Sequence, residues 1–496
     1  MNRNRKSERL YDGITEIRDD LITRAGRESG PDSILFSGRF FRKKRPVIAA
    51  AACFMVLMAV GIALFVIQTQ DSTVSAHTIA EAEYPQMAPY PDPDHYGSEG
   101  DDEFDKAWNA WWEDLSSRRR MTGYVAGMSG FLEKSIRHFL SASMDQNTAF
   151  SPVNLYVALG MLAELTDGNS RAQILELLDS PDIQSVRDQV CGLWNANYLN
   201  DGASARILAN SVWLNEDVHF VPSTMNTLAK NYYASSYRGR MGSESFQQML
   251  RDWLDTQTGG LLTEQIRQLS LLKEDAVLTL ASTVYFRGKW QYEFSTDQTR
   301  SRTFHADTGD LTCDFMHKNK TDETYYWGEH FSAVAQSMGE AGSMWFLLPD
   351  EGVTLKELME DRQAMDFLLS AQKWEWKYQK GMLVNLAVPK FDITSQFDLC
   401  EELPALGITD IFDSQVSDFT PMTKDEDGIV LSAGEHAVRV AADEQGVTAA
   451  AYTVMEMTGS GMPMDETVDF VLDRPFLFVI TDTAGLPLFI GMVCQP

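Results

Sequence analysis

With 496 residues, the chain is long enough to bury a substantial core and exceeds the length of one average domain. Its composition, 44% hydrophobic and 23% charged, is that of a globular protein and excludes a disordered chain. The net charge of −29 is unevenly spread, because residues 1–45 carry 12 Lys/Arg against 7 Asp/Glu while the rest is strongly acidic, which excludes a nucleic-acid-binding function.

The first recognisable element is the apolar run PVIAAAACFMVLMAVGIALFVI at residues 46–67, which contains no charged side chain. At about 1.5 Å per residue, a helix of this length spans roughly 33 Å and can cross a bilayer. The basic cluster RKKR directly precedes it, and such clusters stay on the cytoplasmic side. We therefore predict a cytoplasmic segment over residues 1–45, a single transmembrane helix and an extracellular body. A cleaved signal peptide is the alternative, which the length of the apolar run disfavours.

Residues 68–121 are predicted to form a linker. Their first part is rich in proline and acidic residues and favours a solvated, extended spacer. The following stretch KAWNAWWEDLSSRRR favours an extra short helix. Its tryptophans, Trp108, Trp111 and Trp112, are expected to pack on the domain rather than to bind a ligand.

Residues 122–496 show alternating helix and strand signals, which indicate a mixed α+β domain. FLEKSIRHFL (131–140) has helical periodicity, Ser151 and Pro152 open a second and almost wholly apolar helix, and RAQILELL begins a third. Strand-like runs follow at 276–288, 343–349 and 382–393, and two more lie near the C-terminus.

Several segments resemble the serpin family. They are SPVNLYVALGMLAELTDGNSRAQILELL, ANSVWLN, WLDTQTGG, VYFRGKWQYEF, LLPDEG, VPKFDI, LGITDIF, DRPFLFVI and LPLFIGMV, and they occur in the serpin order over about 375 residues. The resemblance implies a serpin fold with three β-sheets, about eight or nine helices and an exposed reactive-centre loop. It implies a monomeric protease inhibitor. The single anchor with its basic flank and the few cysteines would in addition suit a bacterial cell surface.

The reactive-centre loop lies within residues 441–476. Its first part resembles the hinge of inhibitory serpins, in which an acidic residue and a glycine precede small side chains; the matching residues are Glu444, Gly446, Val447, Thr448, Ala449, Ala450 and Ala451. In the family's mechanism a protease cuts the loop, and the cut loop enters the central sheet with the protease attached. Alternate residues from Val447 to Met457 are small or apolar except Thr453, as a half-buried strand requires. Two departures from the family pattern, Val447 in place of Thr or Ser and Tyr452 within the small-residue run, leave this interpretation intact.

The resemblance also implies a polar cluster below the sheet, at Ser151, Asn154, Ser282 and His436, and a tryptophan, Trp290, where insertion starts. The family commonly has Ser at the position of Asn154 and Asn at the position of Ser282. The two side chains are therefore exchanged in this chain, which preserves the hydrogen-bonding groups.

The sequence narrows the choice of protease. No Lys or Arg lies between Arg439 and Arg474, so trypsin-like enzymes are excluded. Counting from the hinge glycine places the cut bond at Ser460–Gly461, whereas counting back from Pro475 places it near Met464. Met457 and Met462 are further candidates. These residues favour elastase-, subtilisin- or chymotrypsin-like serine proteases, and a papain-like cysteine protease stays open.

An enzyme and a non-inhibitory binding protein are the two functions that compete with protease inhibition. The chain has no HExxH, GxSxG or Walker motif, so we predict that it is not an enzyme and that Ser460 is bait rather than a nucleophile. A non-inhibitory serpin acting as a surface binding or adhesion protein is the alternative. Because the five cysteines form no CxxC pair, no metal site, disulfide framework or cofactor is predicted; they are Cys53, Cys191, Cys313, Cys400 and Cys494.

Overall fold

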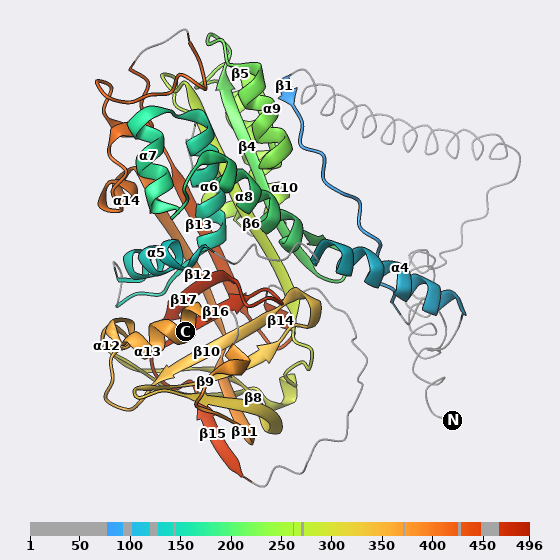
Figure 1. The fold of residues 1–496 in the computed structure, drawn as a ribbon. Coiled ribbons are helices and arrows are strands. Elements are labelled where there is room, and N and C mark those ends of the chain that lie inside the picture. The colour runs from blue at the N-terminus through green and yellow to red at the C-terminus, as the bar shows by residue number, and fades with distance from the viewer. Residues whose placement is uncertain are drawn as a thin grey trace, which may run out of the picture. The chain divides into compact units, whose positions relative to one another are not determined.

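The computed structural model describes residues 77–92, 102–119, 127–141, 145–260, 262–268, 272–370, 373–424, 428–447 and 466–496 (Figure 1). They belong to one compact unit, Val74–Pro496. The predicted transmembrane segment, residues 46–67, lies outside the described residues. Within them, no helix combines the length and apolarity needed to span a bilayer.

The first sheet carries the candidate site. Its strands are hydrogen-bonded in the order β1-β5-β4-β6-β14-β13-β12, with the short β3 paired to β4. Their bounds are β1 Thr78–Ala80, β3 Leu199–Asn200, β4 Ala205–Asn215, β5 Ala234–Gly239, β6 Leu278–Lys289, β12 Phe391–Asp398, β13 Glu435–Ala442 and β14 Gly446–Val447.

The second sheet fills the other half of the domain, in the order β15-β11-β8-β9-β10-β16-β17-β2, with β7 paired to β8 (Figure 1). The bounds are β2 Thr148–Phe150, β7 Arg300–Ala306, β8 Gly309–Trp327, β9 Phe331–Ser337, β10 Ser343–Pro349, β11 Gln379–Pro389, β15 Thr467–Val471, β16 Phe476–Thr481 and β17 Pro487–Val493.

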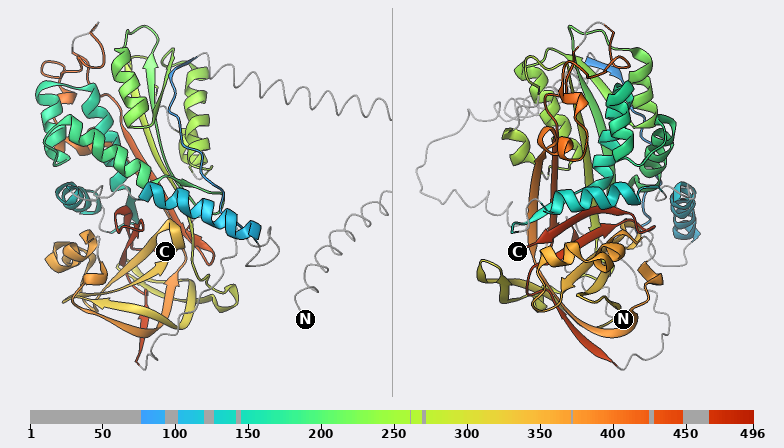
Figure 2. Two further views of the ribbon diagram at one scale, coloured as in Figure 1. Left: turned by 45° about the vertical axis from the view of Figure 1, so that its right-hand side comes forward. Right: turned by 60° about the vertical axis from the view of Figure 1, so that its left-hand side comes forward.

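Helices lie on both faces of the first sheet (Figure 2). The α-helices of the described residues are α4 Asp102–Arg119, α5 Ser129–Ser141, α6 Pro152–Leu165, α7 Gly168–Leu177, α8 Ile183–Asn197, α9 Pro222–Asn231, α10 Glu244–Gln257, α11 Thr263–Gln268, α12 Leu355–Glu360, α13 Arg362–Leu369 and α14 Leu399–Ala405. Four 3₁₀ turns, Thr296–Gln298, Gly339–Ala341, Lys373–Glu375 and Asp410–Phe412, complete the described elements.

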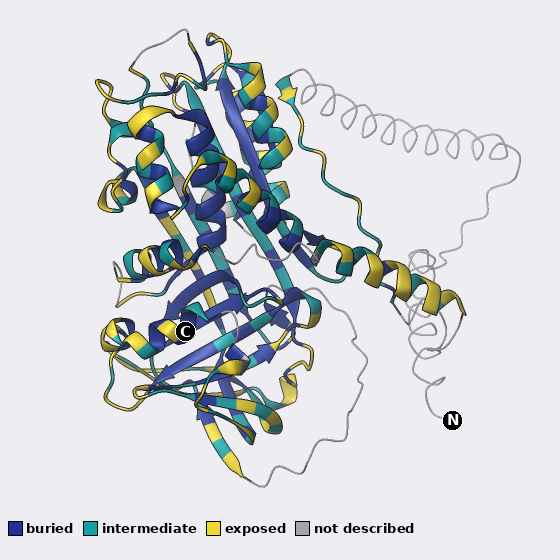
Figure 3. Cartoon of the chain, viewed as in Figure 1, coloured by how far each residue is buried: buried dark blue, intermediate teal, exposed yellow. Residues whose placement is uncertain are grey.

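The sheet is covered on two sides because strand side chains alternate between its faces. On β4, Val212 and Leu214 join the large core cluster with α6 and α8, whereas Trp213 joins a second cluster with Phe246 and Leu250 of α10. β4 and α6 are accordingly buried along almost their whole length, as Figure 3 shows.

The predicted helices and strands are confirmed, with three corrections to the expected architecture. Strand β9 pairs with β8 at Tyr326↔Ala333 and Trp327↔Ser332, so the described residues form two sheets rather than three. From α5 to α14 they contain ten α-helices, where eight or nine were expected. The run 382–393 also divides after Pro389, since β11 and β12 belong to different sheets.

The segment before the domain differs from a solvated spacer where it is described. Strand β1 pairs with β5 and extends the first sheet, and Tyr84 packs among the rings of Trp194, Tyr198 and Tyr233. The helix α4 forms as predicted, but only Trp111 of its three tryptophans is buried; Trp108 and Trp112 remain 36% and 46% exposed.

Candidate hinge and sheet-opening site

The hinge returns into the first sheet directly after β13. Asp443 stabilises the tight turn, because its carboxylate accepts hydrogen bonds from the backbone N–H groups of Gln445 (2.9 Å) and Gly446 (3.2 Å). The backbone of Asp443 also donates to the carbonyl of Gly446 at 3.0 Å. The chain therefore reverses within a few residues and runs back beside β13.

Strand β14 occupies the place between β6 and β13. Gly446 pairs with Lys289 and Val447 with Gly288 of β6, and Val447 also pairs with Ala442 of β13. Among the described strands, β14 is the only backbone bridge between β6 and β13. A Cβ on Gly446 would overlap the carbonyl of Gly288 and lie 2.8 Å from the Cα of Lys289, so the close strand approach itself requires glycine here.

The acidic hinge residue is buried in a set of strong contacts. Glu444 accepts a hydrogen bond from the hydroxyl of Thr299 (2.7 Å), and its carboxylate lies 2.8 Å from the ammonium of Lys390. Burial works to raise the pKa of Glu444, but the hydrogen bonds from Lys390 and Thr299 prevail and lower it. The carboxylate is thus ionised and fixes the hinge to the segment that joins β11 and β12.

Trp290 holds the same turn from the end of β6. Its indole N–H donates to the carbonyl of Asp443 at 2.8 Å, and its backbone N–H donates to the carbonyl of Gln445 at 3.2 Å. The ring is 1% exposed and packs edge-on against Phe294, whose backbone N–H bonds to the carbonyl of Glu444. The predicted insertion-start tryptophan therefore contacts the hinge directly.

The four residues of the predicted polar cluster lie together where the start of α6 meets β6 and β13. The hydroxyl of Ser151 donates to the carbonyl of Leu488 at 2.7 Å and caps α6 by accepting from the N–H of Asn154. The amide of Asn154 donates to the carbonyl of Ser282 at 3.1 Å, and the hydroxyl of Ser282 donates back to the oxygen of that amide. The exchanged pair is therefore in direct contact.

His436 completes this cluster from β13. Its Nε2 accepts a hydrogen bond from the backbone N–H of Ser151 at 3.1 Å, and its ring packs against Phe139 and Phe397. Burial among these rings lowers the pKa of His436 to about 4, so the imidazole is neutral at ordinary pH.

Three residues that contact the candidate site were not predicted from the sequence. Asn210 of β4 lies 2.7 Å from the hydroxyl of Ser282, and Lys390 and Thr299 bind Glu444. Asn210 could have been noticed as a buried amide within the apolar strand ANSVWLN. Lys390 and Thr299 carry no local signal, since each is far from Glu444 along the chain.

The remaining hinge and bond candidates lie outside the described residues; these are Thr448, Ala449, Ala450, Ala451, Met457, Ser460, Gly461, Met462 and Met464. The chain is described again from Glu466, whose carboxylate pairs with Lys380 at 2.6 Å. Strand β15 then pairs in parallel with β11, so both ends of the loop are fixed to strands.

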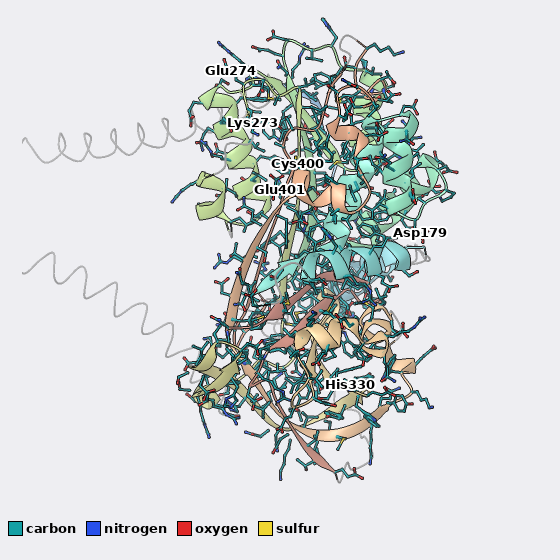
Figure 4. The ribbon with its side chains drawn as sticks, turned by 90° about the vertical axis from the view of Figure 1, so that its left-hand side faces the viewer. Asp179, Lys273, Glu274, His330, Cys400 and Glu401 are labelled. Carbon is teal, nitrogen blue, oxygen red and sulfur yellow. The ribbon has the colours of Figure 1, made fainter. Side chains whose placement is uncertain are left out.

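Within the described residues, no group of three or more His, Cys, Asp or Glu side chains is arranged to hold a metal ion. His330 and Cys400 lie in different halves of the domain, so they cannot act together (Figure 4).

Comparisons with known proteins agree with this arrangement. The chain is 27% identical over 372 residues to Serpin-ZX of Arabidopsis thaliana, covering 72% of this chain and 94% of the relative. It is 26% identical over 379 residues to Alpha-1-antiproteinase 2 of Equus caballus, covering 74% and 86%. The structure of tengpin, a thermophilic serpin in the native state, matches with a TM-score of 0.63 at 23% identity over 75% of this chain and 94% of that one. The model of the family Serpin (serine protease inhibitor) matches residues 129–496, and the chain therefore belongs to the serpin family.

Proposed function

We propose that this chain inhibits serine proteases as a suicide substrate. In this mechanism a protease cuts the reactive-centre loop and remains bound as an acyl-enzyme, while the loop enters the first sheet between β6 and β13 and carries the protease with it. The observation that carries the proposal is the position of Gly446–Val447, which already form the first two residues of a strand between β6 and β13.

Insertion along this path breaks no pairing between described strands. Among them, β6 and β13 are joined only through β14, so an added strand would form new hydrogen bonds on both sides. The alternate residues Val447, Ala449, Ala451, Met455 and Met457 suit the buried face of such a strand. Burying each larger apolar side chain contributes roughly 1.5–3 kcal/mol, which favours the inserted state.

The register of β14 gives a second line of support. Continued in step from Val447, the loop would place Thr453 opposite both Ser282 of β6 and His436 of β13. Thr453 is the one polar residue among the inward-facing positions from Val447 to Met457, and it would meet the polar cluster of Ser151, Asn154, Ser282 and His436. A loop with no insertion function gives no reason for this match.

The test combines protease trapping with a hinge variant. The full chain is mixed with elastase, subtilisin, chymotrypsin and trypsin, and denaturant-resistant complexes and the mass of the released C-terminal peptide are recorded. We expect a complex with at least one of the first three and none with trypsin, since no Lys or Arg lies between Arg439 and Arg474. The peptide mass would distinguish Ser460–Gly461 from Met457, Met462 and Met464.

The variant Ala451→Glu should be cut without forming a complex, because an ionised carboxylate on the inward face of the inserting strand resists burial. The matched variant Ala450→Glu, on the outward face, should still form the complex. If wild-type chain is cut cleanly by each protease without a complex, the chain is a non-inhibitory surface binding or adhesion protein instead. A complex with papain would extend the target class to cysteine proteases.

We also propose that residues 46–67 tether the domain to a cell membrane, with residues 1–45 in the cytoplasm and the domain outside. The support is the uncharged apolar run and the basic cluster before it. In this position the inhibitor would act on proteases that reach the cell surface.

A further inference from the structure

The helix α4 encloses an aromatic cavity that the inhibitory mechanism does not use. The cavity has a volume of about 250 Å³ and lies between α4, the turn after β3 and the end of β6. Four aromatic side chains line it: Tyr90, Trp108, Trp111 and Trp112. Its volume is below the roughly 300–1,000 Å³ typical of sites for drug-sized ligands, so it suits a small head group.

The aromatic wall is fixed in place by the fold. Trp111 donates its indole N–H to the carboxylate of Asp201 at 3.1 Å, and that carboxylate also accepts from the backbone N–H groups of Ala203 and Ser204. Tyr90 donates its backbone N–H to the carbonyl of Asp201 at 2.9 Å. Trp111 lies 5.1 Å from Tyr90 and 5.2 Å from Trp108 between ring centroids. The rings are therefore organised before any ligand enters.

The outer part of the wall is open to solvent. Trp108 and Trp112 are 36% and 46% exposed, although both are large apolar side chains that line the same cavity as the buried Trp111. Exposed tryptophans at the mouth of a cavity present ring faces to whatever enters it. Such faces carry negative charge density and attract cations.

The charge around the rings favours the same class of ligand. Asp201 and Glu340 line the cavity, and the carboxylates of Asp201, Asp92 and Glu340 add to burial in raising the pKa of Tyr90, which reflects a negative potential at its ring. One cation, Lys289, also lines the cavity. Its ammonium lies 3.8 Å from the carboxylate of Glu293, which offsets its charge.

We propose that this cavity binds a small organic cation, an alkylated ammonium or guanidinium group, between the aromatic rings and Glu340. The same chemistry occurs in free metabolites and in Lys or Arg side chains of a partner protein, and the probes below separate these sources. The proposal does not depend on protease inhibition, because neither the trapping assay nor the hinge enters its test.

The test measures heats of binding of choline to the full chain, with 3,3-dimethylbutan-1-ol as the uncharged probe of the same shape. We expect saturable binding of choline and at least tenfold weaker binding of the alcohol, because only the cation is attracted to the rings and carboxylates. Equal binding of both probes, or binding of neither, would overturn the proposal. Tighter binding of N-acetyl-lysine or N-acetyl-arginine methylamide than of choline would identify a protein side chain as the source.

Variants test whether choline binds in this cavity and whether the cavity prefers a cation. Trp108→Leu and Glu340→Gln should each weaken choline binding about fivefold or more. The controls Tyr378→Leu, at a tyrosine of equal 36% exposure elsewhere, and Glu351→Gln, at an exposed acid outside the cavity, should not. Lys289→Met should strengthen choline binding. If Lys289→Met weakens it, or if the two control variants weaken it as much as Trp108→Leu does, the assignment is wrong.

Discussion

His436 shows how a single residue can make the uncut domain sensitive to acid. Its ring is enclosed by Phe139 and Phe397, and its Nε2 is an acceptor for the backbone N–H of Ser151. A protonated ring would lose this acceptor and place a charge in an apolar site. The pKa is therefore lowered to about 4 from its ordinary value of 6.5.

This shift predicts a pH dependence of stability. Because the folded state has the lower pKa, the unfolded chain binds the proton first, so stability is fully present above about pH 6.5 and falls as the pH drops towards 4. The loss is on the order of 3 kcal/mol. His436→Gln, which keeps an acceptor but does not titrate, should flatten this dependence in urea unfolding of the uncut chain. His305→Gln, at a histidine whose side chain is 57% exposed, should retain it. An unchanged slope in His436→Gln would contradict the prediction.

At the scale of elements, local sequence signals were sufficient for the three helices and five strand-like runs that were predicted, but not for the other elements of the domain. The Ser151 cap, the apolar α6 and the runs that became β6, β10, β16 and β17 each carry a local signal. Assembly depends on contacts without such a signal. Two residue pairs between β8 and β9 join two expected sheets into one. No sequence pattern at Tyr326 or Trp327 indicates this pairing.

The candidate site was predicted only in part. The residues of the hinge and the sheet-opening cluster came from the resemblance to serpins, and the structure places those it describes around one slot. Lys390 and Thr299 could not be predicted, because their contact with Glu444 exists only after β11, β12 and the hinge are assembled. The packing of Tyr84 was likewise hidden by the proline-rich, acidic composition around it.

The register of β14 leads to a prediction about the inserted strand. If Thr453 reaches Ser282 and His436, Thr453→Val removes a hydrogen-bonding hydroxyl from a polar cluster in the cleaved form only. We expect the gain in melting temperature on loop cleavage to shrink by about 1–2 °C, as a loss of about 1 kcal/mol would produce in a domain of this size. Thr448→Val, on the opposite face of the strand, should leave the gain unchanged. Equal effects of the two variants would exclude this register.

At the scale of the whole molecule, charge divides the chain at the apolar run. Residues 1–45 are basic, whereas the remainder accounts for a net charge more negative than −29. Basic residues that flank a membrane span are retained on the cytoplasmic side of the membrane. A large negative net charge favours the solubility of a folded domain on the opposite side. The described segment 77–92 already lies on the domain, so few residues separate the apolar run from the folded unit.

This arrangement predicts a membrane protein whose domain is accessible from outside. When the full chain is expressed in bacterial cells, it should stay with the membrane after alkaline carbonate washing, since about 20 apolar residues suffice for a stable span. Protease added to intact spheroplasts should remove the domain while an epitope tag at residue 1 remains protected. Replacing the four basic residues at 42–45 with asparagine should weaken this orientation, whereas replacing the basic residues at 3–9 should affect it less, because charges closest to the span dominate. Release of a soluble chain that begins near residue 77 would show instead that the apolar run is a cleaved signal peptide.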